Sequence, residues 1–187
     1  MATYNVLAIC GSLRQGSLNR FALKAASELA PPELQIEIAE LDQIPLFNGD
    51  VFAKGLPPGV VALREKIRAA DAIMFASPEY NYSLSGVLKN ALDWTSRAPD
   101  QPFEGKPVSI ISATQGPIGG ARSQYELRKV MLFVNAHTMI KPEIFIGTAQ
   151  NRFDAATGKL TDEPTRKILG EHMVALRDWI TRIKKLG

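Results

Sequence analysis

The stretch Cys10-Gly11-Ser12-Leu13-Arg14-Gln15-Gly16-Ser17-Leu18-Asn19-Arg20 decides the fold of this chain. It follows the apolar run Val6-Leu7-Ala8-Ile9, which is typical of a buried strand, and a helical pattern begins near Leu18. A buried strand that runs through a polar loop into a helix is the opening unit of a parallel sheet covered by helices. The sequence therefore predicts an α/β fold in which this unit repeats.

The same loop has the properties of an anion site. A helix N-terminus offers unpaired N–H groups and a partial positive charge. Ser12, Ser17 and Asn19 add polar side chains, and Arg14 adds a full positive charge. Neither a Walker A lysine nor Gly-x-Gly-x-x-Gly spacing is present, so a ligand with one terminal phosphate fits better than a nucleoside triphosphate or a dinucleotide. The plainer alternative is a strand-to-helix turn capped by a serine.

Strand-like and helix-like patterns alternate along the rest of the chain. Strands are expected at 4–10, 34–40, 72–76, 108–113 and 138–146, the last interrupted by Pro142. Helices are expected at 18–30, 60–70, 85–97, 121–136 and 165–186. These elements predict a flavodoxin-like doubly wound sandwich, formed by residues 1–187 as a single domain, with a five-stranded parallel sheet of order 2-1-3-4-5 and helices on both faces. The long segment 42–59 is expected to be a lid or a contact surface.

Two further loops are expected to join the first at the carboxyl ends of neighbouring strands, where such sheets bind ligands. After the third strand, Tyr80 and Tyr82 supply flat surfaces with polar tips, and the peptide groups of 79–81 suit the edge of a heterocycle. After the fourth strand, residues 114–120 carry three glycines, which make room for a flat ring or allow a turn with positive φ. Together the loops predict a crevice for a planar ligand with a single phosphate, such as FMN.

Composition and charge narrow the possible partners. The chain has 22 Lys and Arg against 19 Asp and Glu, a formal net charge of +3, and a pI of about 9.0. This mild excess favours an anionic small molecule, and no basic run interleaved with aromatics indicates nucleic acid. No stretch has the length of a membrane-spanning helix, and the single cysteine, Cys10, fits a reducing compartment, so a soluble cytoplasmic protein is expected. His137 and His172 are expected on helices without the spacing of metal ligands and are interpreted as structural.

Three motifs in this chain carry a family resemblance. Gly11-Ser-Leu-Arg-Gln-Gly-Ser-Leu-Asn19, Pro78-Glu-Tyr-Asn-Tyr-Ser83 and Leu88-Lys-Asn-Ala-Leu-Asp-Trp94 resemble the NADPH-dependent FMN reductase family, within which the chain is most similar to the bacterial chromate and quinone reductase group. The resemblance extends over nearly the whole chain, through 119–122 and 141–143. It implies bound FMN, NADPH or NADH as co-substrate, and a homodimer or a homotetramer built as a dimer of dimers.

The resemblance also implies roles for individual residues. The FMN phosphate would be held by Ser12, Arg14, Ser17, Leu18 and Asn19. The isoalloxazine ring would be flanked, mainly through backbone groups, by Pro78, Glu79, Tyr80, Asn81 and Tyr82, while Thr114 and Gly116 would contact ribityl or ring atoms. Arg97 and Arg122 are the candidates for the 2′-phosphate of NADPH, and Arg122, Tyr125 and Glu143 are candidates for subunit contacts.

The implied reaction is a ping-pong transfer of hydride from NAD(P)H to FMN and of electrons onward to an acceptor such as a quinone, chromate, an azo compound, a ferric chelate or free flavin. The flavin carries this chemistry, so no side chain is assigned as catalytic and no metal is expected. Cys10 is interpreted as a packed thiol. Two other classes stay open: a flavodoxin-like electron carrier without its own NAD(P)H step, disfavoured by the basic pI, and a phosphate-binding regulatory module without flavin.

Overall fold

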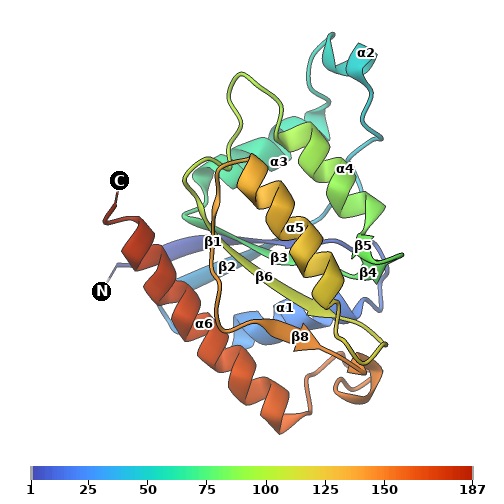
Figure 1. Ribbon diagram of the computed structural model, residues 1–187, viewed down its shortest axis with the longest axis vertical. Helices are drawn as coiled ribbons and strands as arrows, with labels where there is room; N and C mark the ends of the chain where they lie inside the picture. The colour runs from blue at the N-terminus through green and yellow to red at the C-terminus, as the bar shows by residue number, and fades with distance from the viewer. Residues whose placement is uncertain (1, 187) are drawn as a thin grey trace.

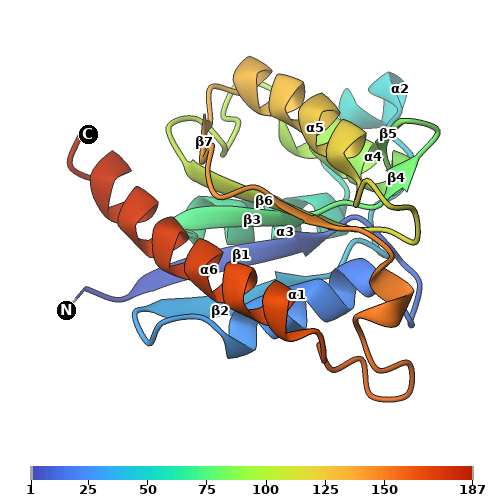
Figure 2. The same cartoon turned by 60° about the horizontal axis from the view of Figure 1, so that its bottom comes forward.

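The central sheet has the predicted parallel order in its first four positions. The computed structural model describes residues 2–186. Its strands are β1 (Tyr4–Cys10), β2 (Leu34–Ala39), β3 (Ala72–Ala76), β4 (Glu79–Tyr80), β5 (Ser83–Leu84), β6 (Pro107–Ala113), β7 (His137–Thr138) and β8 (Ile144–Ile146). The main sheet runs β2-β1-β3-β6, with β7 and β8 both paired to β6, and β4 and β5 form a separate antiparallel hairpin. Every pairing in the main sheet is parallel (Figure 2).

Helices cover both faces of this sheet, as predicted. They are α1 (Leu18–Glu28), α2 (Gly49–Phe52), α3 (Pro58–Ala69), α4 (Gly86–Thr95), α5 (Ala121–Phe133) and α6 (Glu163–Ile183), with a 3-10 turn at Ala149–Asn151. Helices α1 and α6 pack on one face, and α3, α4 and α5 pack on the other (Figures 1 and 2). Within residues 2–186, none of these helices combines the length and the hydropathy needed to cross a membrane.

Alternating side chains divide the apolar residues between two cores. In β1, Val6 and Ala8 pack under α1 and α6, whereas Leu7 and Ile9 pack under the three helices of the other face. Successive side chains of a strand point to opposite faces, and both faces are covered here. That is why the central strands read as continuous apolar runs instead of alternating ones.

Residues 138–146 do not form the single strand predicted for them. β7 pairs with the start of β6, and β8 pairs with its end, at residues 111–113. The chain leaves the sheet between them, around Pro142, which has no N–H group to donate to a strand ladder. His137 is the first residue of β7. The prediction that it lies on a helix is therefore wrong. The fifth position of the sheet is shared by two short strands.

His172 of α6 is buried between the sheet and this break. Its Nδ1 lies 2.8 Å from the carbonyl oxygen of Pro142, and its Nε2 lies 2.6 Å from the hydroxyl of Ser109 on β6. A carbonyl oxygen only accepts, so Nδ1 carries the proton and Nε2 accepts from the serine. Burial lowers the pKa of His172 to about 4. The neutral ring thus joins α6, β6 and the segment between β7 and β8.

Acid is expected to destabilise the protein through His172. Because its pKa is about 4 in the folded chain and about 6.5 in an unfolded one, the unfolded chain binds the proton first on acidification. The stability conferred by the neutral ring is complete above pH 6.5 and is lost between about pH 6.5 and 4, at a total cost of about 3 kcal/mol. Urea unfolding at a series of pH values measures this slope. His172→Gln is expected to reduce the dependence of stability on pH, and His137→Gln is expected to leave that dependence unchanged. Equal slopes in wild type and His172→Gln would contradict the role given to His172.

The segment 42–59 is an arm docked on α4. The carbonyl oxygen of Pro45 accepts hydrogen bonds from Asn90 Nδ2 and Trp94 Nε1, both at 2.8 Å. The backbone N–H of Phe47 donates to Asn90 Oδ1 at 2.8 Å, and its ring meets the Trp94 ring edge-on with centroids 4.8 Å apart. Beyond these contacts α2 stands away from the rest of the protein (Figure 1). The base of the arm is therefore held, while its tip projects.

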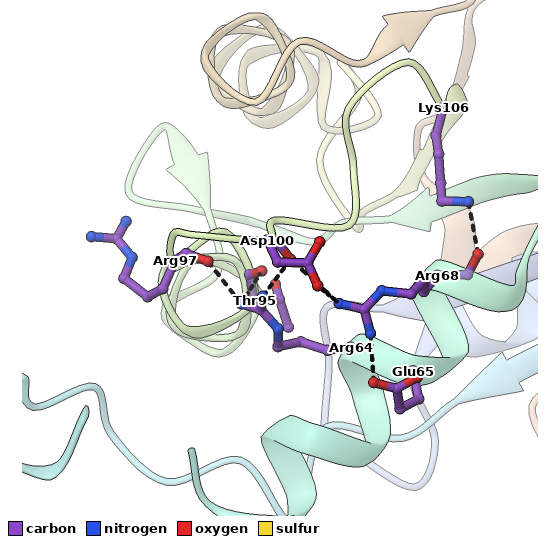
Figure 3. Close-up of polar contacts among 7 residues, drawn as sticks. All are labelled: Arg64, Glu65, Arg68, Thr95, Arg97, Asp100 and Lys106. Carbon is purple, nitrogen blue, oxygen red and sulfur yellow. Dashed lines mark hydrogen bonds and ion pairs between the residues drawn. The ribbon is translucent and has the colours of Figure 1, made fainter. Parts of the chain in front are cut away.

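A pair of arginines on α3 holds the loop that follows α4. Arg64 is 6% exposed, and its guanidinium donates to the carbonyl oxygens of Thr95 at 3.1 Å, Arg97 at 2.9 Å and Asp100 (Figure 3). One turn later Arg68 donates to the Asp100 carboxylate at 2.6 Å. A helix leaves its last carbonyl groups without partners. Arg64 supplies donors for the end of α4 and fixes the loop that leads to β6.

Candidate functional site

The three predicted loops meet in one crevice at the carboxyl ends of β1, β3 and β6. The cavity measures about 260 Å³ and is lined by Ser12, Arg14, Ser17, Leu18, Asn19, Pro78, Glu79, Tyr80, Ala113, Thr114, Gln115 and Gly116. All the predicted site residues are among them except Asn81 and Tyr82, which lie beyond its edge in the β4–β5 hairpin. Ala113 and Gln115 were not predicted. The crevice lies where the order of parallel strands reverses, as the doubly wound topology requires.

The loop after β1 presents donors toward this crevice. Ser17 is the N-cap of α1, and its hydroxyl accepts from the backbone N–H of Arg20 at 3.3 Å. Ser12 is buried, and its hydroxyl accepts from the backbone N–H of Arg14 at 3.4 Å. The side chain of Arg14 is exposed and forms no ion pair with any residue in the described range 2–186. One end of the crevice therefore combines two hydroxyl groups, a helix N-terminus and an arginine without an ion-pair partner.

The side chain of Asn19 connects the loop after β1 to the end of β6. Its Nδ2 donates to the carbonyl oxygen of Ala113 at 2.8 Å, and its Oδ1 accepts from the backbone N–H of Ala113 at 2.9 Å. The side chain is 3% exposed. The predicted role for Asn19 was to hold a phosphate, but both ends of its amide are engaged by the protein. The backbone N–H of Asn19 lies in the first turn of α1, where the N–H groups have no partner within the helix and suit an anion.

The loop after β3 folds into a tight hairpin that was not predicted from the sequence. Tyr80 pairs with Ser83, so Asn81 and Tyr82 form a two-residue turn. Both have positive φ, 51° and 68°, which is the type I′ geometry that matches the twist of paired strands. Tyr80 and Tyr82 are 50% and 69% exposed. The hairpin therefore places two open aromatic side chains beside the crevice.

The glycines after β6 serve two different purposes. Gly119 and Gly120 have φ of 62° and 85°, and a Cβ on Gly119 would lie 2.5 Å from the carbonyl carbon of Phe145. These two glycines make the turn and allow it to pack on β8. Gly116 lines the crevice and faces open space, since a Cβ on this residue would meet nothing within 4 Å. The positive-φ turn predicted for these glycines is therefore formed by Gly119 and Gly120, whereas Gly116 leaves open space at the crevice.

Cys10 is packed in the core below the crevice. The side chain is 2% exposed, and its thiol donates to the carbonyl oxygen of Ser12 at 3.6 Å. Burial raises the pKa of this thiol, which disfavours the reactive thiolate. Among residues 2–186, no group of three His, Cys, Asp or Glu side chains is arranged to hold a metal ion.

Comparison with known proteins agrees with this geometry. A family model described as NADPH-dependent FMN reductase matches residues 4–151, which include all three loops of the crevice. The chain belongs to this family. The predicted family, the predicted flavodoxin-like fold and the predicted NAD(P)H-dependent flavin oxidoreductase activity, with FMN as cofactor, are thereby confirmed.

Relatives of this FMN reductase family member match it over nearly its whole length. An NAD(P)H-dependent FMN reductase of Pseudomonas aeruginosa is 52% identical over 179 residues, which are 96% of each chain. A quinone reductase of Escherichia coli strain K12 is 43% identical over 181 residues, again 96% of each chain. Among solved structures, a flavoenzyme NAD(P)H:(acceptor) oxidoreductase of Paracoccus denitrificans superposes with a TM-score of 0.87 at 35% identity, covering 96% of this chain and 98% of that one.

Proposed function

We propose that the crevice binds FMN with its phosphate at the N-terminus of α1 and its ring between the loops after β3 and β6. Ser12, Arg14 and Ser17 hold the phosphate, together with the backbone N–H groups of Leu18 and Asn19. Pro78, Glu79, Tyr80, Asn81 and Tyr82 flank the ring through their backbone, and Thr114 and Gly116 contact its ribityl side. The donor set fits the group: one exposed arginine and a helix N-terminus suit a single dianionic phosphate.

Bound FMN supplies the chemistry, which is the acceptance of hydride from NAD(P)H and the transfer of electrons to a second substrate. The role of the chain is to bind FMN and to orient it. The ionisable side chains that line the crevice are Arg14, Glu79 and Tyr80, and Glu79 is already ion-paired with Arg122 at 2.6 Å. The one carboxylate of the lining is therefore already engaged, and hydride transfer to a flavin needs no side-chain acid or base.

We propose a quinone as the electron acceptor. The name of the Escherichia coli relative supports this class, and so does the exposure of Tyr80 and Tyr82, whose rings offer a flat ligand a surface to stack on. Chromate, azo compounds, ferric chelates and free flavin are the competing acceptors. Turnover rates measured with a quinone and with each of these acceptors, all at the same concentration, rank the acceptors.

Three further features complete the proposal. Residues 1–187 form one FMN-binding domain, supported by two cores that share one sheet. The protein assembles as a homodimer or homotetramer, supported by the exposed apolar side chains Leu132, Phe133 and Ile140 at 82%, 78% and 69%. It works in the cytoplasm, supported by a lone buried cysteine.

The observation that carries this proposal is the single crevice that gathers residues from all three predicted loops. An anaerobic visible spectrum of FMN-loaded protein tests it, before and after NADPH is added. Bleaching of bound flavin at catalytic speed, reversed by a quinone, is the expected result. Bound flavin that stays oxidised would indicate an electron carrier, and a protein that binds no FMN would indicate a regulatory phosphate site.

Removing the cation of the first loop is expected to weaken FMN binding. Arg14→Ala lowers the affinity by about 1.5–3 kcal/mol, the range for hydrogen bonds to charged groups, or roughly 10- to 150-fold. Quenching of flavin fluorescence during titration measures the dissociation constant. Gln15→Ala, an exposed neighbour in the same loop, is the matched control. If Arg14→Ala bound FMN with wild-type affinity, the placement of the phosphate at this end of the crevice would be contradicted.

A further inference from the structure

Glu79 is unusual among the residues of the crevice because its charged side chain is buried. The side chain is 8% exposed. Its Oε1 accepts from Arg122 Nε at 2.6 Å, and its Oε2 accepts from the backbone N–H groups of Arg122 at 3.1 Å and Ser123 at 3.4 Å. Helix α5 has Gly120 at its N-cap and no side-chain cap of its own. The carboxylate of Glu79 therefore takes the place of a cap, at the positive end of the helix.

The β4–β5 hairpin depends on contacts of this kind. Each of its strands is two residues long, and an isolated ladder of that size is not stable in water. Tyr82 also has a left-handed backbone conformation, which is unfavourable for a non-glycine residue and persists only when its surroundings hold it. Something outside the hairpin must fix its position.

Arg122 provides that contact. Its guanidinium carbon lies 3.6 Å from the centre of the Tyr82 ring, in cation–π stacking. The same guanidinium is held by Glu79, which lies at the base of the hairpin. Glu79, Arg122 and Tyr82 therefore form a closed chain of contacts that begins in β4, passes through the first residues of α5 and returns to the tip of the hairpin.

We propose that Glu79 is a positioning residue of the flavin site, which fixes the β4–β5 hairpin against α5 by holding Arg122 on the ring of Tyr82. The inference rests on the proposed placement of the FMN ring beside this hairpin. It assigns a role to the Glu79 side chain, in addition to the role of its backbone. Glu79 lines the crevice, and the half-exposed positive charge of Arg122, which lies next to it, compensates its buried negative charge.

This pairing has an electrostatic signature that a purely structural role lacks. Reduction adds negative charge to a flavin, so a positive charge nearby raises its midpoint potential and a negative charge lowers it. Glu79→Gln removes the carboxylate and leaves Arg122 uncompensated, so the potential of bound FMN is expected to rise. Arg122→Gln leaves the carboxylate, still bonded to the N–H groups of α5, and the potential is expected to fall. The double variant is expected to return toward the wild-type value.

The experiment compares these variants with Glu126→Gln, which removes a carboxylate of α5 that pairs with Lys129 at the surface. Dye equilibration gives the midpoint potential of bound FMN, and fluorescence titration gives its affinity. Glu79→Gln is expected to weaken FMN binding at least tenfold, and Glu126→Gln to change neither quantity. Shifts of potential in the same direction for Glu79→Gln and Arg122→Gln, or no shift in either, would overturn the proposal.

Two outcomes separate this proposal from the one it rests on. If wild-type protein and Glu126→Gln bind no FMN, the proposed function fails. If both bind FMN and are reduced by NADPH while the opposite shifts are missing, only the role of Glu79 fails. If Glu79→Gln does not fold, Arg122→Gln alone decides, because it keeps the carboxylate cap of α5: a lowered potential supports the proposal and an unchanged one contradicts it.

Discussion

Replacing Arg64 by alanine is expected to lower the free energy of unfolding by about 3 kcal/mol. The guanidinium donates to three backbone carbonyl groups at the end of α4 and in the loop after it. Truncation leaves these acceptors without donors, and a buried acceptor left unpaired costs about 1–3 kcal/mol. That penalty applies in full to the buried carbonyl group of Thr95 and in part to those of Arg97 and Asp100, which water reaches. Arg64→Lys is expected to recover part of the loss, because a single ammonium group cannot span the three acceptors that a planar fork reaches.

Urea unfolding of the protein without flavin measures this loss. The matched control is Arg68→Ala, four residues further along the same helix. The side chain of Arg68 bonds to Glu65 and Asp100 at the exposed surface (Figure 3). Exposed ion pairs contribute little to stability, so Arg68→Ala is expected to be much the milder change. Equal losses in the two variants would show that the carbonyl groups find other donors.

Replacing Asn19 by leucine is expected to destabilise the protein even when no flavin is present, by about 4 kcal/mol. Leucine has nearly the same shape but neither donates to nor accepts from Ala113, so a buried N–H and a buried carbonyl group lose their partners. The two elements that this amide joins, α1 and β6, carry two of the three loops of the crevice. FMN affinity is therefore expected to fall as well.

Measurement in the absence of flavin separates this role from that of a phosphate ligand. A residue that only binds phosphate leaves the flavin-free protein as stable as before. Arg14→Ala is the matched control, since its exposed side chain forms no ion pair within residues 2–186, and it is expected to change flavin binding without changing the unfolding curve. If Asn19→Leu unfolded like wild type, its amide would not be a structural brace.

The parts of the site that could be predicted from the sequence are those that follow from strand order. Ser12, Pro78 and Thr114 each come directly after or close to the end of an apolar run, and parallel strands bring such ends to one edge of the sheet. The apolar runs are long because both faces of the sheet are covered, so they are conspicuous in the sequence. The crevice could therefore be located without coordinates.

What could not be predicted are contacts between side chains and distant backbone. Asn19 meets Ala113 at a separation of 94 residues, and Glu79 meets Arg122 at 43; no local pattern encodes either pairing. The hairpin was missed because its turn is Asn81-Tyr82, whereas the usual signal for type I′ geometry is asparagine followed by glycine. The last strand was predicted whole because apolar residues stand at both ends of the range 138–146. The polar residues between them, with Pro142 at their centre, mark the place where it breaks.

The docked arm gives the protein an optical property. Of its two tryptophans, Trp94 is fully buried and bonds to the carbonyl oxygen of Pro45 at the base of the arm. Trp179 on α6 is only partly buried and donates to the carbonyl oxygen of His137. Their indole emission therefore differs in colour and in access to a dissolved quencher. Replacing Trp179 by phenylalanine leaves Trp94 as the single tryptophan, and its emission reports whether the arm is docked on α4, without any label attached.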